Sequence, residues 1–108
     1  MKYSEEPNID YVKDIANGDI AFETQLIDII RNELPFEIKE FQQNFDSKDY
    51  LRAAENVHKL KHKINIFGLS KGYIVATDFE KELKKSSFSN YIIFKEILLT
   101  IENYVKTL

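Results

Sequence analysis

The sequence predicts an all-α protein, an antiparallel up-down-up-down four-helix bundle with a short additional N-terminal helix. Apolar residues recur every three or four positions in several long segments, whereas the alternation typical of a strand is hard to find. Short polar stretches join these segments, and only 3 glycines and 2 prolines interrupt the chain. Because short connections favour antiparallel neighbours, a bundle is expected. The 108 residues are enough for one domain, residues 1–108.

The first predicted helix is short, about residues 8–16, and presents Ile9, Val12 and Ile15 or Ala16 on one face. Asn17-Gly18 ends it, since glycine adopts the left-handed conformation found at helix ends. Asp19 can cap a second helix over about residues 20–44. We expect one long kinked helix or two nearly collinear ones, because Pro35 interrupts the backbone ladder while the apolar spacing continues. This spacing involves Phe22, Leu26, Ile29, Ile30, Leu34, Ile38, Phe41 and Phe45.

The third predicted helix spans about residues 48–67, with Ser47 as its N-cap and Asp49 adding negative charge to its first turn. Gly68 closes it at a C′ position. A fourth helix over about residues 71–85 is capped by Ser70, a polar linker covers residues 86–90, and the last helix spans about residues 90–107. The apolar faces of these two helices hold Tyr73, Ala76, Phe79, Leu83, Phe94, Ile97, Leu98, Ile101, Tyr104, Val105 and Leu108.

Composition excludes several classes of function. The formal net charge is −3, which lacks the basic excess of a nucleic-acid-binding domain. The absence of cysteine excludes disulfides, thiolate zinc sites and thiol nucleophiles. No apolar run approaches the roughly 20 residues needed to span a bilayer, and the N-terminal segment 1–7 lacks the apolar core of a signal peptide. A cytoplasmic location is the simplest interpretation.

Both histidines of the chain lie on the third predicted helix, which buries one apolar stripe made of Ala53, Val57, Leu60, Ile64 and Phe67. His58 follows the stripe by one residue, so it is rotated by about 100° toward water. Residues three, four and seven positions further along share its face. They are Lys61, His62 and Asn65.

An exposed neutral imidazole is a nucleophile that can accept a phosphoryl group at physiological pH. Lys61, with an expected solvated head group, could neutralise the phosphate oxygens, and the small Ala54 would not obstruct approach. Lys59 and Lys63 would add a general positive field from other faces. On the helical pattern alone, a merely solvated histidine on a lysine-rich surface is the favoured interpretation, so the pattern does not establish the chemistry.

Other chemistry is less consistent with the residues present. His58 and His62 have the spacing of a helical zinc site, but Lys59 replaces the catalytic glutamate and a third ligand is not identified. Glu55-x-x-His58 has the spacing used in di-iron bundles, yet the chain lacks a second such motif. We expect no metal site. Without a nucleophile elbow or a glycine-rich phosphate loop, an independent enzyme with its own cofactor is not expected.

The segment His58-Lys59-Leu60-Lys61, followed by Gly68-Leu69, resembles the signature of histidine-containing phosphotransfer (HPt) domains. The histidine, the leucine two residues on, the lysine three on and the glycine ten on all match. Small residues before the histidine, Ala53-Ala54, also fit the family. Phe79-Glu80 looks like the apolar-Glu pair on the next helix of the family fold, a four-helix bundle with an added helix.

The resemblance implies that His58 is the phosphoacceptor and that Lys61 stabilises the phosphate. The docking face for the partner would be formed by Ala54, Glu55, His62 and Asn65. The implied partner is a response-regulator receiver domain, alone or within a hybrid histidine kinase, whose aspartate exchanges the phosphate and which supplies the Mg²⁺. The resemblance also implies a carrier that does not bind ATP, and we expect a monomer. The charge and the helix patterns favour binding to neither nucleic acid nor membrane.

The family usually has glycine, or another small residue, where His62 stands. The partner receiver could be shaped to fit His62, His62 could rotate and hydrogen-bond the phosphate, or the domain could be a weak or inactive relay kept for binding. A helical interaction module without phosphotransfer therefore stays open as a second function. A dimeric kinase-type helical hairpin is a third, although such hairpins usually place an acid after the histidine and Lys59 follows here.

Overall fold

The computed structural model describes residues 3–108, which form five α-helices and no β-strand. The helices are α1 (Asp10–Ala16), α2 (Ile20–Asp46), α3 (Tyr50–Ile66), α4 (Ser70–Leu83) and α5 (Tyr91–Val105). The prediction of an all-helical chain is confirmed, and α2 is one continuous helix through Pro35. Met1 and Lys2, the start of the segment in which we expect no signal peptide, lie outside the described residues.

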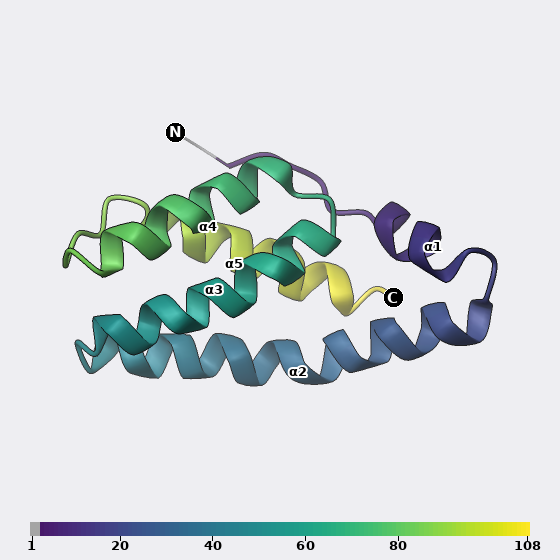
Figure 1. The fold of residues 1–108 in the computed structure, drawn as a ribbon, viewed down its shortest axis with the longest axis horizontal. Coiled ribbons are helices and arrows are strands. Elements are labelled where there is room, and N and C mark those ends of the chain that lie inside the picture. The colour runs from purple at the N-terminus through teal and green to yellow at the C-terminus, as the bar shows by residue number, and fades with distance from the viewer. Residues whose placement is uncertain (1–2) are drawn as a thin grey trace.

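The four long helices lie lengthwise beside one another in a body of 44 × 26 × 20 Å (Figure 1). Helix α3 packs against α2 and α4, and α5 packs against α4 and α2, while the short α1 packs against the beginning of α2. No helix in the described part of the chain has both the length and the apolar character needed to cross a membrane.

The core is built around α3, whose predicted apolar stripe is fully buried from Ala53 to Phe67. Phe41 of α2, Phe79 of α4 and Phe94 of α5 meet edge to face or tilted, with ring centroids 5.1–6.1 Å apart. Phe22 and Ile29 were expected on the apolar face of α2, but they are 42% and 46% exposed. Helix α2 has 27 residues and extends beyond the other three long helices, and the short α1 packs against it there.

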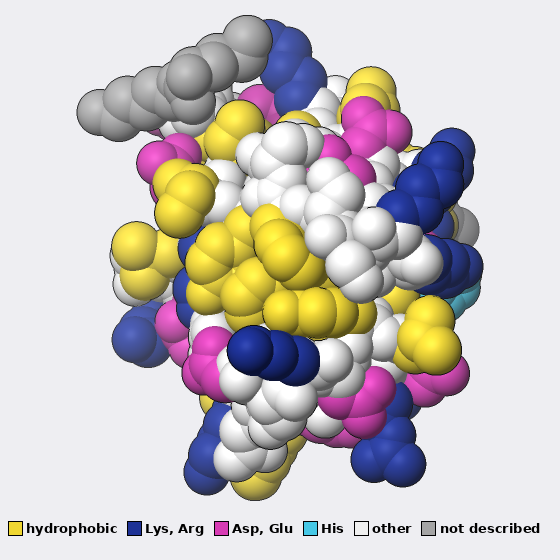
Figure 2. Space-filling model, turned by 90° about the vertical axis from the view of Figure 1, so that its left-hand side faces the viewer, with side chains coloured by type: hydrophobic (Ala, Val, Ile, Leu, Met, Phe, Trp, Pro, Cys, Tyr) yellow, Lys and Arg dark blue, Asp and Glu magenta, His cyan; other side chains and the backbone are white. Residues whose placement is uncertain are grey.

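A second group of aromatic rings closes the end of the molecule where α2 meets α3 and α4 meets α5. Phe45 stacks on Tyr91 with ring centroids 4.2 Å apart, and Phe88 contacts both Phe45 and Tyr50. Figure 2 shows a hydrophobic patch on this end of the molecule. These rings anchor the loop after α4, and they thereby hold the C-terminal half of α4 against α3.

Two of the three predicted N-caps are wrong. Asp19 caps α2 as expected, accepting from Phe22 N at 3.0 Å. Ser47 does not cap α3: α2 continues to Asp46, Ser47 is its C-cap, and the side chain of Asp49 accepts from the α3 backbone instead. Ser70 is the first residue of α4 and makes no cap with its own side chain.

The N-terminus of α4 is capped by a residue from a distant part of the chain. The carboxylate of Glu5 accepts hydrogen bonds from Lys71 N at 3.0 Å and Gly72 N at 2.8 Å. Ser70 therefore need not act as the cap, because an acid already satisfies the free N–H groups of the first turn. The C-terminal end of α3 agrees with the prediction, since Gly68 has φ +79° and Leu69 N bonds Ile64 O at 3.2 Å.

Replacing Glu5 by glutamine is expected to lower the free energy of unfolding by about 1 kcal/mol, because an amide caps a helix less well than a carboxylate. Burial alone would raise the pKa of Glu5, but the hydrogen bonds from Lys71 and Gly72 outweigh it and lower the pKa. The stabilisation is therefore complete above the ordinary value of 4.5 and is lost as the pH falls through the lowered value. Thermal unfolding near neutral pH and near pH 3 should show a difference that shrinks in acid. The exposed neighbour Glu6→Gln is the control, and equal melting of wild type and Glu5→Gln at neutral pH would contradict the cap.

Candidate functional site

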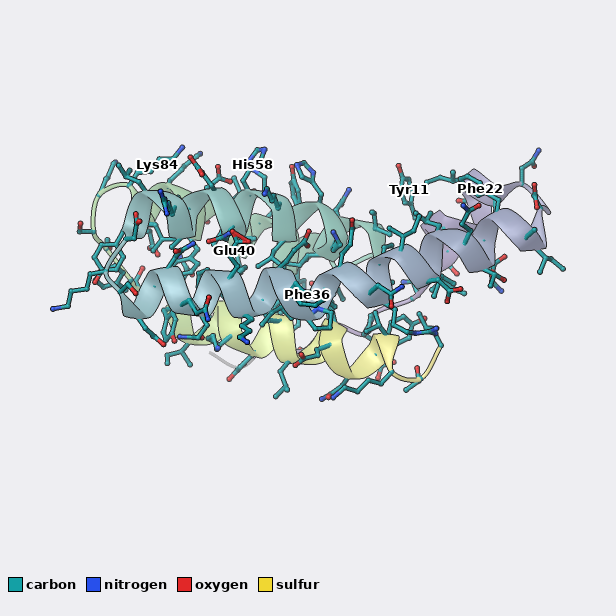
Figure 3. The ribbon with its side chains drawn as sticks, turned by 90° about the horizontal axis from the view of Figure 1, so that it is seen from below. Tyr11, Phe22, Phe36, Glu40, His58 and Lys84 are labelled. Atoms are coloured by element: carbon teal, nitrogen blue, oxygen red, sulfur yellow. The ribbon has the colours of Figure 1, made fainter. Side chains whose placement is uncertain are left out.

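His58 lies on the solvent side of α3, as predicted. The buried stripe fixes the rotation of the helix, and the His58 side chain is 54% exposed. In Figure 3 it points away from the bundle, on the same side as Lys84. His62 and Asn65 are exposed on the same helix, and the His62 ring meets the His58 ring edge to face with centroids 5.0 Å apart. The structure therefore places three of the four residues of the predicted face, His58, His62 and Asn65, together on the surface of α3.

Glu80 of α4 completes the site around His58. Its neighbour Phe79 is fully buried and anchors α4, which turns Glu80 toward α3. The carboxylate lies 3.2 and 3.3 Å from His58 Nδ1, and Lys61 Nζ is 2.9 Å from Glu80 Oε1. Only the family resemblance pointed to Glu80 as a site residue, and the structure places its carboxylate against Nδ1 of the imidazole.

The charge of Glu80 decides which imidazole nitrogen carries the proton. Burial would raise the pKa of the Glu80 carboxyl, but the hydrogen bond and charge of Lys61, with a smaller contribution from His58, outweigh it and lower the pKa. At neutral pH the carboxylate is ionised and can only accept hydrogen bonds. In neutral His58 the proton therefore resides on Nδ1, and Nε2 carries the lone pair.

Lys61 is not solvated, and that expectation is wrong. Its side chain is 11% exposed, because α4 packs over it, and Nζ lies 5.7 Å from the centre of the Tyr73 ring. Lys63 likewise adds little free positive charge, since its ammonium pairs with Glu33 at 3.1 Å and Glu37 at 2.8 Å. Much of the lysine charge expected around His58 is already paired.

An open hollow of about 300 Å³ lies beside His58 between α3 and α4, lined by Ala54, Glu55, His58, Lys59, Glu80 and Lys84. Ala54 is 1% exposed and its small side chain leaves the hollow open, as expected. Sequence reasoning missed Lys84, whose Nζ is 3.9 Å from Glu80 Oε2. The available signal was its spacing, four residues after Glu80 on one helix face.

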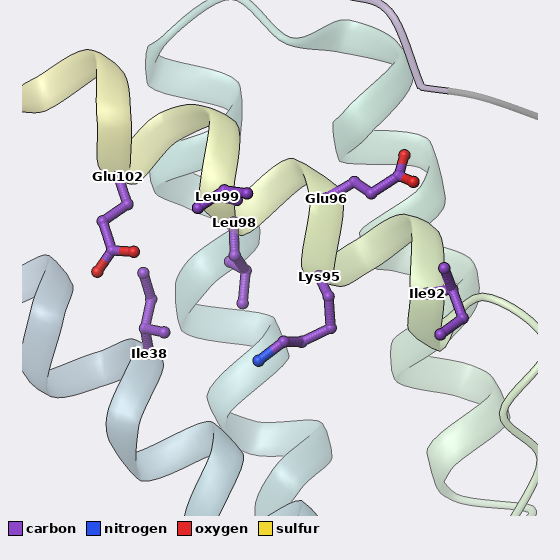
Figure 4. Close-up of a pocket in the computed structure, with 7 residues that line it drawn as sticks. All are labelled: Ile38, Ile92, Lys95, Glu96, Leu98, Leu99 and Glu102. Carbon is purple, nitrogen blue, oxygen red and sulfur yellow. The ribbon is translucent and has the colours of Figure 1, made fainter.

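Two further hollows lie elsewhere on the surface. One, of about 330 Å³, lies between α2 and α5 and is mainly apolar (Figure 4). It is lined by Ile38, Ile92, Lys95, Glu96, Leu98, Leu99 and Glu102. The other, of about 380 Å³, is polar, lies between α2 and α3, and includes Asn44 and Asn56. Neither contains an imidazole, so the hollow at His58 is the candidate site for nucleophilic chemistry.

Within residues 3–108, no three His, Cys, Asp or Glu side chains gather in a way that could hold a metal ion. No protein-family model, curated protein or solved structure matches the chain. The fold and site define an all-helical protein with an exposed histidine oriented by a carboxylate from the neighbouring helix.

Proposed function

We propose that the protein is an HPt-type phosphorelay intermediate, in which His58 carries a phosphoryl group between the aspartates of receiver domains. One observation carries the proposal: Glu80 holds Nδ1 of an imidazole that is 54% exposed, which leaves Nε2 as the nucleophile. The helix arrangement supports it, since the contacts among α2, α3, α4 and α5 suit an up-down-up-down bundle with α1 as the added helix.

In the proposed step, the Nε2 lone pair of His58 attacks the phosphorus of a receiver aspartyl phosphate. The new N–P bond forms as the P–O bond to the aspartate breaks, and the aspartate leaves as a carboxylate. Nδ1 keeps its proton, so the phosphorylated ring is an imidazolium, and the negative charge of Glu80 beside Nδ1 stabilises it. In a later step of the same kind, run in reverse, an aspartate oxygen of a second receiver attacks the phosphorus. The N–P bond breaks, and His58 becomes neutral again.

The proposed partner is a receiver domain that brings its own Mg²⁺ and covers the surface around His58. Ala54 provides space, while Glu55, His62 and Asn65 are exposed around the histidine and form the proposed docking face. The proposal makes the protein a cytoplasmic, monomeric carrier without ATP binding.

A non-catalytic interaction module is the second candidate, and one observation favours it. The His62 ring lies against the His58 ring, with centroids 5.0 Å apart, where the family usually has a small residue. A partner that uses this face only for binding would tolerate the bulk of His62. Partner binding that is indifferent to the chemistry of His58 distinguishes this module from a relay.

Incubation of the wild-type protein with a receiver phosphorylated on its aspartate tests the proposed function. A phosphoryl label that is acid-labile and base-stable is expected, because a phosphoramidate bond has those properties. Intact-mass measurement should show the addition of one phosphoryl group per chain. An acid-stable label would point to a hydroxyl group, and the absence of label from every cognate receiver of the source organism would favour the interaction module.

A further inference from the structure

Two lysines approach Glu80 from different sides, and they differ in how firmly they are held. Lys61 is 11% exposed, with Nζ 2.9 Å from Glu80 Oε1, so separating the pair would leave two poorly solvated charges. Lys84 is 58% exposed, and its Nζ is 3.9 Å from Glu80 Oε2, at the outer limit of an ion pair. A surface pair of this kind contributes little to stability, so Lys84 can leave Glu80 readily and Lys61 cannot.

Lys84 also lies beside His58. Both residues line the same hollow of about 300 Å³, and both approach the same oxygen, Glu80 Oε2, with His58 Nδ1 at 3.2 Å. Figure 3 shows His58 and Lys84 on one side of the molecule. The four-carbon stem of an exposed lysine is flexible, so its ammonium can follow a charge that appears beside the imidazole.

We propose that Lys84 is the cation that binds the phosphoryl group of phosphorylated His58, while Lys61 acts as a positioning residue that holds Glu80. This inference deepens the proposed function and rests on it. A phosphoryl group brings nearly two negative charges and three acceptor oxygens to the hollow. Glu80 would repel these oxygens if it were not neutralised, and Lys61 keeps it neutralised when Lys84 moves to the phosphate.

The remaining charged groups around the hollow are less suited to this role. Glu55 and Lys59 lie one helical turn apart on α3 and both line the hollow, so the acid offsets the charge of Lys59. Lys59 also borders the polar hollow between α2 and α3, together with Glu40. Lys84 is the exposed cation at the hollow whose ammonium already lies near the Glu80 oxygen that His58 Nδ1 also contacts.

The test uses potassium phosphoramidate, a small donor that phosphorylates exposed imidazoles without a partner protein. The reaction exchanges the donor's N–P bond for one to Nε2 and releases ammonia. His62→Gln serves as the background, because the chain has 2 histidines and His58 is then the only imidazole. The measured quantity is the pH midpoint at which the ³¹P resonance of the phosphorylated protein titrates, since a nearby cation favours the dianion and lowers that midpoint.

Lys84→Gln should raise the midpoint by about half a pH unit, as expected for the loss of one exposed cation partner. Lys84→Arg should keep the low midpoint. Lys71→Gln removes the same charge from the other end of α4 and should change nothing. The double variant Lys61→Gln/Glu80→Gln removes the ion pair between Lys61 and Glu80 without changing the net charge. It should also keep the low midpoint.

A midpoint that stays unchanged in Lys84→Gln but rises in the double variant would assign the phosphate to Lys61 and overturn the inference, while the relay function would stand. A rise in Lys59→Gln alone would overturn it in favour of Lys59. A label that forms with phosphoramidate but never with any receiver would refute the relay function and leave the anion site in place. Failure of phosphoramidate to label His58 would refute both.

Discussion

His58→Gln is expected to abolish transfer from a phosphorylated receiver, with a loss of label below detection. Glutamine keeps a polar side chain of similar reach but has no nitrogen lone pair that can attack phosphorus at neutral pH. The fold should survive, because the side chain is 54% exposed and surface substitutions usually change the free energy of unfolding by no more than about 0.5 kcal/mol. Labelling of the two proteins side by side, with circular dichroism to verify the fold, measures this outcome.

His62→Gln is the matched control, since it makes the same chemical change one helical turn further along the exposed face. If His62 only borders the docking face, this variant should keep the label on His58. Full labelling of His58→Gln together with loss of label in His62→Gln would move the phosphoacceptor to His62. Slower labelling of His62→Gln than of wild type would indicate that His62 hydrogen-bonds the phosphate.

The periodicity of α3 was sufficient to predict which of its faces is buried and that His58 points outward. Such a prediction needs only the 3.6-residue repeat of one helix, and it does not depend on how that helix meets its neighbours. The fate of Lys61 was not predictable in this way. It lies on the edge between the two faces, and only the position of α4, with Glu80 and Tyr73, turns its ammonium inward.

The same limit explains the errors at the helix ends. Ser47 has the right chemistry for an N-cap, yet α2 extends to Asp46 and Asp49 takes that role. The cap of α4 comes from Glu5, more than sixty residues earlier in the chain. Local rules rank the capping residues near a helix, but they contain no information about a carboxylate that tertiary structure brings to the same N–H groups.

Glu80→Gln is expected to slow phosphotransfer by about 10²-fold and to lower the free energy of unfolding by about 1–3 kcal/mol. The rate should fall because an amide neither favours the proton on Nδ1 of His58 as strongly nor stabilises the imidazolium that forms. Stability should fall because Lys61, which is 11% exposed, loses its charged partner. Initial rates of label transfer and thermal unfolding measure the two effects separately.

The acid dependence of stability separates a charge effect from a packing effect at Glu80. Since the pKa of Glu80 is lowered in the folded protein, its contribution is complete above the ordinary value of 4.5 and is lost as the pH falls through the lowered value. The difference in melting temperature between wild type and Glu80→Gln should therefore shrink as the pH falls below 4.5. Asp78→Asn, which makes the same change at an exposed position of α4, should show neither the loss of rate nor this pH dependence. A constant difference at every pH would mean that Glu80 acts through packing, whereas an unchanged transfer rate would remove it from the orientation of His58.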